Sequence, residues 1–411
     1  MTGIGAAKRS ERNPRGAPGR GEGSKVDESK TVVVACDMAT PYGWGTEACW
    51  KGLLSGRTAI GPFDRFDTGA FPTRKAGVIE ELVSGGPESL AMQMLAPLLG
   101  GPASPFPEDA FLILATTTGE IDFLERQALG ENREASESRL DRLLAKVIEA
   151  TGVHGGAMVV SAACASSSAA IARGAAMIRG GGPSSVLVVA CDCVSEFVFS
   201  GFSSLMALDA DVARPFDRGR SGLSLGEAAG FVLLMSGERA SREGRDSLGE
   251  ILGWGLTNDA NHMAGPSRDG AGLARAIGKA LGTAEAQAGA VGCISAHGTG
   301  TVYNDAMEMK AFKSVFGARP IPVYSIKGGT GHTLGAAGLI ETIVALRTLR
   351  EHRVPPTVNL ERVDDGARGW VFRESVEFSG EVTLSTNSGF GGVNCALALR
   401  APGGARGAHG R

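Results

Sequence analysis

The sequence has few aromatic residues and no long apolar run, and its charges nearly balance. Phe, Trp and Tyr make up 6% of the 411 residues, and 41 Lys and Arg face 44 Asp and Glu. A net charge of -3 provides no broad positive field, so we expect no nucleic-acid partner. Because the sequence contains no uninterrupted apolar stretch of membrane-spanning length, we also expect no membrane span.

The cysteines do not form a recognisable disulfide framework. There are seven of them, an odd number, and Cys191 and Cys193 are too close together for a zinc knuckle. We therefore predict a reduced, cytoplasmic protein in which most thiols are small buried side chains. The first residues also lack the apolar segment of a secretory signal, which agrees with this compartment.

Glycine, by contrast, is abundant, with 61 residues spread through apolar segments. This distribution favours tight turns and close backbone contacts over disorder. Both ends of the chain differ from the rest. Residues 1–30 and 401–411 contain few apolar side chains that could be buried, so we predict that both segments are disordered tails. Between them we expect an N-terminal half at 31–250 and a C-terminal half at 251–400.

Strand-like and helical patterns alternate through both halves. Short apolar runs predict strands at 31–36, 111–119, 184–192, from 291, at 321–327, and on both sides of a Gly-rich turn in 382–399. Apolar residues at helical spacing predict buried helices at 165–180 and 335–351. The alternation indicates an α/β protein with helices packed on mixed sheets, and a two-fold internal similarity is compatible with it.

Cys164 stands between an apolar strand and an Ala-rich helix, in VVSAACASSS. A thiol at a helix N-terminus lies at the positive end of the helix dipole, which favours the nucleophilic thiolate. The free N–H groups of the first turn could also receive an oxyanion. A buried, inert cysteine is the ordinary alternative. The small residues around Cys164 favour the nucleophile, because they let a substrate approach closely.

Two histidines follow strand-like segments in the second half. His297, in SAHGTGT, lies at a strand end, where α/β proteins place reactive groups. His332, in SIKGGTGHTLGAAG, lies near Lys327 and Glu341. A Lys, a His and a Glu near a helix start predict a tuned proton or charge network. A structural His297, and a capping His332 beside a solvated lysine, are the alternatives.

Taken together, these motifs resemble the β-ketoacyl-acyl-carrier-protein synthases, condensing enzymes of the thiolase superfamily. The matching segments are SAACASSSAA, ARPFDRGRSGLSLGEAAG, SAHGTGTVYNDAMEMKAF, SIKGGTGHTLGAAGLIE and NSGFGGVN, and the resemblance covers nearly all of the chain between the tails. It implies a thiolase-like fold, in which two similar α/β halves form a layered α-β-α-β-α core. The order Cys, His, His implies an elongating synthase of fatty acid or polyketide-like biosynthesis.

The resemblance also implies a role for each matching residue. Cys164 would hold the acyl chain as a thioester, while His297 and His332 promote decarboxylation of a malonyl unit and stabilise the enolate. The backbone N–H groups of Cys164 and Phe390 would form the oxyanion hole. The other expected site residues are the catalytic charged pair Lys327 and Glu341, the supporting acids Asp305 and Glu308, and the substrate-binding Thr118, Phe202, Thr299, Thr301, Ser388 and Phe390.

The expected partners follow from the same resemblance. An acyl carrier protein would bring the substrates as phosphopantetheine thioesters, so neither a metal nor an organic cofactor is expected. A dimer is expected too, either with itself or with a ketosynthase-like subunit. The apolar strand at 184–192 is the predicted seam of that dimer.

Two other functions are weighed against the synthase. A non-catalytic subunit resembling a chain-length factor would keep the fold and shape a partner's pocket, but such subunits usually lose the cysteine that Cys164 provides here. The two-histidine arrangement argues against a thiolase or acyl-CoA transferase, and a thiolase would need a second catalytic cysteine near the C-terminus. Cys395 lies late in the chain, but inside the final predicted strand, where packing is the expected role.

Several positions depart from the family pattern. Ser221 stands in place of an Asp, Asn261 in place of an aromatic residue, and the segment from about 61 to 112 is shorter than usual. Thr118 places a hydroxyl where the acyl pocket is expected, although Thr is also common in strands.

Ser388 stands where the family has a Phe that gates the acyl pocket, which predicts a looser or differently shaped entrance. We expect Ser388→Phe to narrow that entrance and to change the preferred acyl chain, measured as relative loading of acyl-carrier thioesters of different lengths. An unchanged preference would contradict the prediction.

Overall fold

The computed structural model describes residues 30–101, 106–131 and 134–402. Apart from Lys30, Ala401 and Pro402, the two predicted tails lie outside the described residues. Within those ranges, no helix is both long enough and apolar enough to cross a membrane.

An eleven-stranded sheet runs through the molecule, and its two halves repeat one strand order. The N-terminal half follows the order β6 (Ala157–Val160), β5 (Phe111–Ala115), β7 (Ser185–Asp192), β8 (Ala228–Ser236), β1 (Thr31–Thr40). The C-terminal half follows the order β11 (Val323–Tyr324), β10 (Val291–Ser295), β14 (Val382–Gly389), β15 (Val393–Arg400), β9 (Gly249–Asn258). In each half the first two pairings are parallel and the last two antiparallel. The halves meet where β1 pairs briefly with β9.

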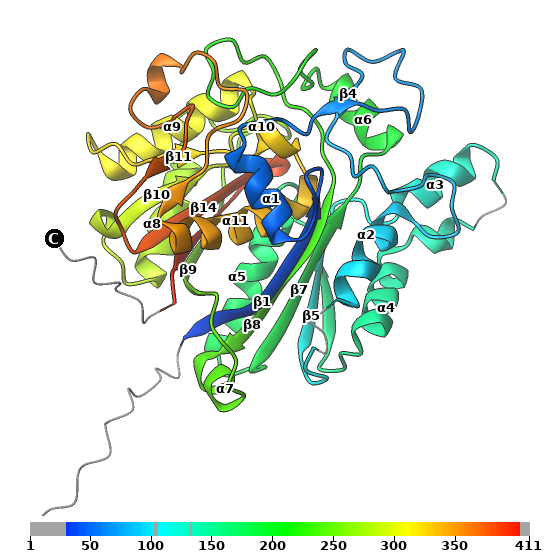
Figure 1. Cartoon of the computed structure of the whole chain (residues 1–411), viewed down its shortest axis with the longest axis horizontal. Coiled ribbons are helices and arrows are strands. Elements are labelled where there is room, and N and C mark those ends of the chain that lie inside the picture. Colours follow the sequence, from blue (N-terminus) through cyan, green and yellow to red (C-terminus); the bar gives the residue numbers. More distant parts are fainter. Residues whose placement is uncertain (1–29, 102–105, 132–133, 403–411) are drawn as a thin grey trace, which may run out of the picture.

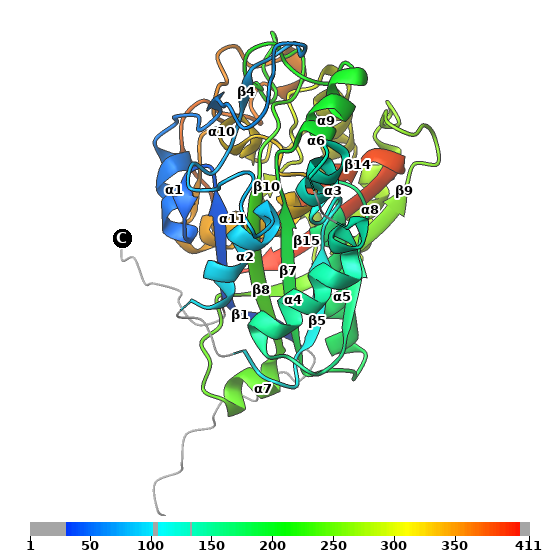
Figure 2. The same ribbon diagram turned by 90° about the vertical axis from the view of Figure 1, so that its right-hand side faces the viewer.

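Helices cover both faces of each half, which produces five layers (Figures 1 and 2). The outer layers are α2 (Leu90–Leu99) with α4 (Leu140–Thr151), and α8 (Ala271–Thr283) with α9 (Val302–Phe316). The central layer is α5 (Ser166–Arg179) with α11 (Ala337–Glu351), which contact each other and both halves of the sheet. The predicted layered core of two similar α/β halves is therefore confirmed.

Strand β7 shows why the sheet is covered on both faces. Its apolar side chains alternate between two clusters, because successive residues of a strand point to opposite faces. Val186 and Val188 pack in the central cluster with α5 and α11, whereas Leu187 and Val189 pack outward against α2 and α4. A run that is apolar at every position is typical of a strand buried on both faces.

The remaining described elements include β2 (Gly43–Trp44), the eleventh strand of the sheet, which pairs with the end of β1, and the helices and short strands outside the two half-sheets. The latter include α1 (Thr46–Leu54), β3 (Gly61–Pro62), β4 (Lys75–Ala76), α3 (Ile121–Ala128), α6 (Glu196–Ser204), α7 (Gly237–Arg242), α10 (Lys327–Thr330), β12 (Arg353–Val354) and β13 (Val376–Glu377). Within 61–112, where the segment is shorter than usual in the family, the described regular elements are β3, β4, α2 and the start of β5.

Two predicted strands are shorter than expected. The strand at 111–119 ends at Ala115, because the next residues turn to donate hydrogen bonds from Thr116 and Thr117 to the buried carboxylate of Asp192. The strand at 321–327 is reduced to β11, since Pro322 has no N–H for the ladder and Lys327 already begins α10. The early turn carries Lys327 toward the interior.

The predicted dimer seam at 184–192 is wrong. This segment forms β7, which lies between β5 and β8, so both of its edges are already paired. The strand at the outer edge of the N-terminal half is β6, and each of its four residues is half-buried.

The two central helices approach most closely at Gly338. A Cβ atom there would overlap with the Ser168 hydroxyl and lie 2.8 Å from the Ser168 backbone N. Next to it, the N–H of Leu339 donates to the Ser167 hydroxyl over 2.8 Å. Small residues on both helices therefore permit the contact that joins the two halves.

We expect Gly338→Ala to destabilise the protein by about 1–3 kcal/mol, because overpacking forces the helices apart. Gly278 on α8 is the matched control, since it is exposed and a Cβ there would meet nothing within 4 Å. Gly278→Ala should be neutral or stabilising by about 0.5–1 kcal/mol. Thermal melts of both variants test this, and equal melting temperatures would contradict the tight crossing.

Candidate active site

Cys164 lies in a strained turn between β6 and α5. Ala163 has a φ of 48°, a left-handed conformation that is unfavourable for a residue with a Cβ. The Ser166 hydroxyl holds the turn by accepting from the Ala162 N–H over 2.8 Å and donating to the Ala163 carbonyl over 2.6 Å. The turn leaves Cys164 buried, 6% exposed, just before the first turn of α5.

Two acidic residues of α9 fix the loop that carries His297. The N–H of His297 donates to Glu308 over 2.8 Å, and the N–H of Thr299 donates to Asp305 over 3.1 Å. Burial and the neighbouring Asp305 raise the pKa of Glu308 to about 8, although backbone N–H donors oppose the rise. The structure thus places the predicted supporting acids behind the loop, where they hold its backbone.

The fold brings the predicted nucleophile and both histidines together. The ligand atoms of Cys164, His297 and His332 all lie within 4.8 Å of one another, and all three residues are buried. The two imidazole rings meet edge to face, with centroids 5.1 Å apart and an interplanar angle of 83°. Three segments far apart in the sequence therefore form one compact site.

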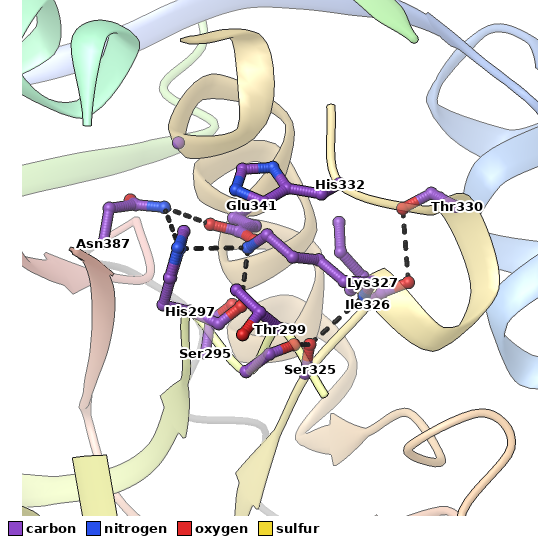
Figure 3. A network of polar contacts seen from close by, with 12 residues as sticks. Ser295, His297, Thr299, Ser325, Ile326, Lys327, Thr330, His332, Glu341 and Asn387 are labelled. Carbon is purple, nitrogen blue, oxygen red and sulfur yellow. Dashed lines mark hydrogen bonds and ion pairs between the residues drawn. The ribbon is translucent and has the colours of Figure 1, made fainter. Parts of the chain in front are cut away.

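Lys327 joins this site to Glu341 (Figure 3). Its ammonium group donates to the Glu341 carboxylate, to the His297 carbonyl over 2.6 Å, and to His297 Nδ1 over 3.2 Å. These three contacts use all three donors of the group. Burial raises the pKa of Glu341, while Lys327 and Asn387 act in the opposite direction. The predicted Lys, His and Glu network is present as a set of contacts.

The contacts of the two Nδ1 atoms decide which tautomer each histidine adopts. His297 Nδ1 faces the Lys327 ammonium, and His332 Nδ1 accepts from the Leu334 N–H over 3.0 Å. Burial, followed by Lys327, holds the pKa of both imidazoles well below the usual range, so both rings are neutral. Because each Nδ1 faces a donor, the ring proton resides on Nε2.

This tautomer decides between a metal site and a hydrogen-bonding site. The spacing of Cys164, His297 and His332 would suit a metal ion, but a metal needs an unprotonated ring nitrogen. Protonating His332 Nδ1 instead would set it against the Leu334 N–H. In this tautomer the arrangement offers two Nε2–H donors.

Burial dominates the ionisation of Cys164. It raises the pKa of the thiol to about 11, while Lys327 and the backbone N–H of Phe390 act in the opposite direction. The net rise from 9.0 corresponds to about 3 kcal/mol, more than a helix N-terminus usually contributes. The resting Cys164 is thus a neutral thiol, although its position before a helix had favoured a thiolate. The N–H groups of Phe390 and Cys164 both reach the sulfur, where the predicted oxyanion hole would be.

Two cavities meet at Cys164. The first, of about 490 Å³, is called the entrance cavity, and among its lining residues are His297, His332, Thr299, Thr301 and Ser388. The second, of about 430 Å³, is called the inner cavity, and among its lining residues are Thr118, Val198, Leu205 and Leu334. The stacked rings of Phe202 and Phe390, 5.5 Å apart, line both cavities. A larger cavity of about 610 Å³, near Phe63 and Ile79, includes none of these residues.

All four hydroxyls expected to contact substrate have partners within the protein, and those of Thr299 and Thr301 lie 3.0 Å from each other. Thr118 donates to Asp192 over 3.1 Å, so its hydroxyl hydrogen points toward the protein and away from the inner cavity. Ser388 donates to the Asn394 side chain over 2.7 Å at the wall of the entrance cavity. The looser entrance predicted from Ser388 stays a prediction.

Sequence reasoning missed Asp192 and Asn387. Asp192 is fully buried at the end of β7 and accepts from the Gly335 N–H over 2.7 Å, which ties the start of α11 to the inner cavity. Asn387 is fully buried in β14 and donates to Glu341. For Asp192 a signal was available, because it ends a strand that is apolar almost throughout and buried polar groups need partners. Asn387 follows Ser385 and Thr386 in a largely polar strand, so its sequence context carried no such signal.

Comparison with known proteins agrees with this site. The model of the β-ketoacyl synthase N-terminal domain matches residues 141–240, and that of the C-terminal domain matches 248–361. A 3-oxoacyl-[acyl-carrier-protein] synthase 2 of Synechocystis is 30% identical over 92% of this chain and 99% of its own length. The ketoacyl synthase alpha subunit of the tetracenomycin polyketide synthase of Streptomyces glaucescens is 30% identical over 91% and 98%. The solved ishigamide ketosynthase/chain length factor superposes with a TM-score of 0.82 at 29% identity, covering 91% of this chain and 99% of that one.

A five-layered α/β fold with a buried thiol facing two imidazoles defines a condensing enzyme of the thiolase type. Within that class, the chain belongs to the β-ketoacyl synthase family. The predicted enzyme class and the predicted ketosynthase function are confirmed, and the chain-length-factor alternative is no better supported. Cys395, the thiolase alternative's second cysteine, lies in the central apolar cluster and lines neither cavity at Cys164.

The neutral thiol makes alkylation of Cys164 steeply dependent on pH. With a pKa of about 11, only about one part in ten thousand is thiolate at pH 7, so the iodoacetamide rate should rise about tenfold per pH unit up to pH 9.5. Intact-mass time courses measure the rate, and Cys164→Ala identifies the modified site. A rate already at its plateau near pH 7 would show that the helix dipole and Lys327 outweigh burial.

Proposed function

We propose that this chain elongates acyl chains by decarboxylative condensation, using Cys164 as the nucleophile. The observation that carries the proposal is the meeting of one thiol and two Nε2–H donors where two cavities join. One cavity can hold the growing chain while the other admits the malonyl unit. The reaction then runs in three steps, with Cys164 acting in the first and third and the two histidines in the second.

The first step transfers the acyl chain to Cys164. The sulfur attacks the carbonyl carbon of the incoming thioester, a new C–S bond forms, and the bond to the carrier's sulfur breaks. The carrier leaves as a thiol after receiving the proton that Cys164 releases. The N–H groups of Cys164 and Phe390 stabilise the negative oxygen of the tetrahedral intermediate. Because the resting thiol is neutral, this proton transfer belongs to the step itself.

The second step removes CO2 from a malonyl thioester in the entrance cavity. The C–C bond to the carboxylate breaks, and its electron pair forms an enolate whose oxygen lies between His297 and His332. Both rings donate from Nε2, so they stabilise the developing charge without moving a proton. Both donors meet the thioester carbonyl oxygen, and their hydrogen bonds strengthen as negative charge develops on that oxygen during decarboxylation.

The third step joins the two units. The enolate carbon attacks the carbonyl carbon of the Cys164 thioester, a C–C bond forms, and the C–S bond breaks. Cys164 leaves as a thiolate and takes a proton from the solvent, since its raised pKa favours the neutral form. The product is a β-ketoacyl thioester on the carrier that delivered the malonyl unit.

The cavities suit the two ends of such a substrate. The inner cavity is lined mainly by apolar side chains and fits an acyl chain, while the entrance cavity offers the hydroxyls of Thr299 and Thr301 to a phosphopantetheine arm. Support for an acyl carrier protein as partner comes from the names of the related synthases. The chemistry needs no metal or organic cofactor, and a reducing compartment, which we take to be the cytoplasm, would keep Cys164 as a free thiol.

We further propose a dimer built on the outer edge of β6. Among the described residues no strand pairs with that edge, and its side chains are half-buried. An open edge of this kind can add a strand from a second chain. Phe197, which is 61% exposed and lines the inner cavity, is an apolar side chain that a second subunit would cover. The second subunit of this dimer is either another copy of this chain or a ketosynthase-like subunit.

Intact-mass analysis after incubation with acyl-carrier thioesters of varied length tests the function. We expect one acyl group per chain on the wild type and none on Cys164→Ala. With malonyl-carrier added, the loaded enzyme should form a β-ketoacyl product, whereas His332→Ala should load normally but decarboxylate at least about 100-fold more slowly. The best-loaded chain identifies the substrate class.

Matched controls separate the possible failures. Cys395→Ala should load like the wild type, because this thiol lies outside both cavities. Absence of loading with every chain would overturn the catalytic proposal and favour the chain-length-factor-like role. Native mass spectra of the same samples report assembly, and a monomer at micromolar concentration would overturn the dimer on β6.

A further inference from the structure

Asn387 lies beside His297 and the charged pair behind it (Figure 3), and its amide oxygen contacts the helix that follows Cys164. It is fully buried in β14. Its amide nitrogen donates to Glu341 Oε2 over 2.6 Å and lies 3.5 Å from His297 Nδ1. Its amide oxygen accepts from the hydroxyl of Ser168, one turn along α5 from Cys164. The Asn387 side chain therefore contacts the helix that follows Cys164, the helix that carries Glu341, and the imidazole of His297.

The partners determine how the amide is oriented. An ionised carboxylate can only accept, so the NH2 group must face Glu341. The oxygen then faces the Ser168 hydroxyl, which can donate to it. Both ends of the amide are satisfied, as burial demands, and the orientation has no alternative that keeps both contacts.

Asn387 and Lys327 each donate to a different carboxylate oxygen of Glu341. Oε1 accepts from the Lys327 ammonium and Oε2 accepts from the Asn387 amide. Without the amide, Oε2 would be buried and unpaired unless the carboxylate turned both oxygens toward Lys327. That rotation would draw the ammonium away from His297 Nδ1, which it now reaches over 3.2 Å. The tautomer and aim of His297 depend on that contact.

We propose that Asn387 is a positioning residue for decarboxylation, which acts on His297 through Glu341 and Lys327. The inference rests on the proposed function, because it assigns a task within the second step. It predicts a selective defect: acyl transfer relies on Cys164 and its N–H donors, whereas decarboxylation relies on the aim of His297. A side chain needed only for packing would affect both steps together.

The charges around Glu341 set the expected dependence on pH. The groups that face it are Lys327 from α10, Tyr324 from β11 and, through Lys327, His297. Burial raises the pKa of Glu341, and the Lys327 and Asn387 contacts lower it. Removing the amide donor therefore raises that pKa further. Glu341 then takes up a proton at a higher pH, so the acid limb of the decarboxylation profile moves to higher pH.

The test compares Asn387→Ser and Asn387→Asp with a neighbouring control in the full-length protein. Thr386→Val removes another buried polar group of β14, whose hydroxyl donates to the Ser295 carbonyl and touches none of the charged pair. Cys164 loading is followed by intact mass with the acyl-carrier thioester that loads the wild type best. Decarboxylation is followed as CO2 release from malonyl-carrier protein between pH 5.5 and 9.

We expect Asn387→Ser to load within about twofold of the wild type but to decarboxylate about 10- to 100-fold more slowly, with its acid limb shifted to higher pH. Asn387→Asp keeps the shape and, when protonated, can donate to Glu341. It should therefore recover activity as the pH falls and lose it as the pH rises, opposite in sign to Asn387→Ser. Thr386→Val should change neither rate beyond about twofold.

Three results would overturn the proposal: equal losses in loading and decarboxylation for Asn387→Ser, wild-type decarboxylation by that variant, or the same pH profile for the Ser and Asp variants. The failure of the proposed function looks different, because the wild type itself would then neither load nor decarboxylate. Melting temperatures of both variants near that of the wild type would exclude unfolding as the cause.

Discussion

The buried ammonium group of Lys327 is the constraint on which the site depends. A charge in the interior is tolerated only if acceptors surround it, and this one needs three at fixed positions. The chain supplies them from two segments: the loop after β10, through the carbonyl and Nδ1 of His297, and helix α11, through Glu341. Satisfying one charge therefore fixes the imidazole that faces Cys164, and the low polarity around it keeps that imidazole neutral.

The repeated half-sheets explain how such distant segments meet. The chain enters the central layer after β6 in the N-terminal half, at Cys164 before α5, and after β11 and the short α10 in the C-terminal half, at His332 before α11. The two central helices pack against each other through small residues, with Gly338 against Ser168. The strand ends thus converge at the junction of the halves. The active site lies at this junction, and residues from both halves are needed to form it.

Burial has opposite effects on the nucleophile and on its helpers. It raises the pKa of Cys164, which makes the thiol a poor nucleophile until a substrate arrives. The same burial lowers the pKa of both histidines, which keeps them as neutral donors. A single low-polarity environment therefore holds the resting enzyme uncharged at its reacting atoms. Lys327 and Glu341 carry opposite charges, and they neutralise each other in an ion pair behind His297.

The α/β class and the residues Cys164, His297, Lys327, His332 and Glu341 could be predicted from the sequence, whereas the layered pair of halves followed from its resemblance to the β-ketoacyl synthases. Apolar periodicity and contiguous motifs carry that information within short windows of the chain. Features that depend on contacts between distant segments could be seen in the tertiary structure alone. It placed 184–192 inside the sheet, made the thiol neutral, and revealed Asn387 and Asp192. A pKa or a hydrogen-bond partner is set by whatever packs against the group, and local sequence does not record that neighbour.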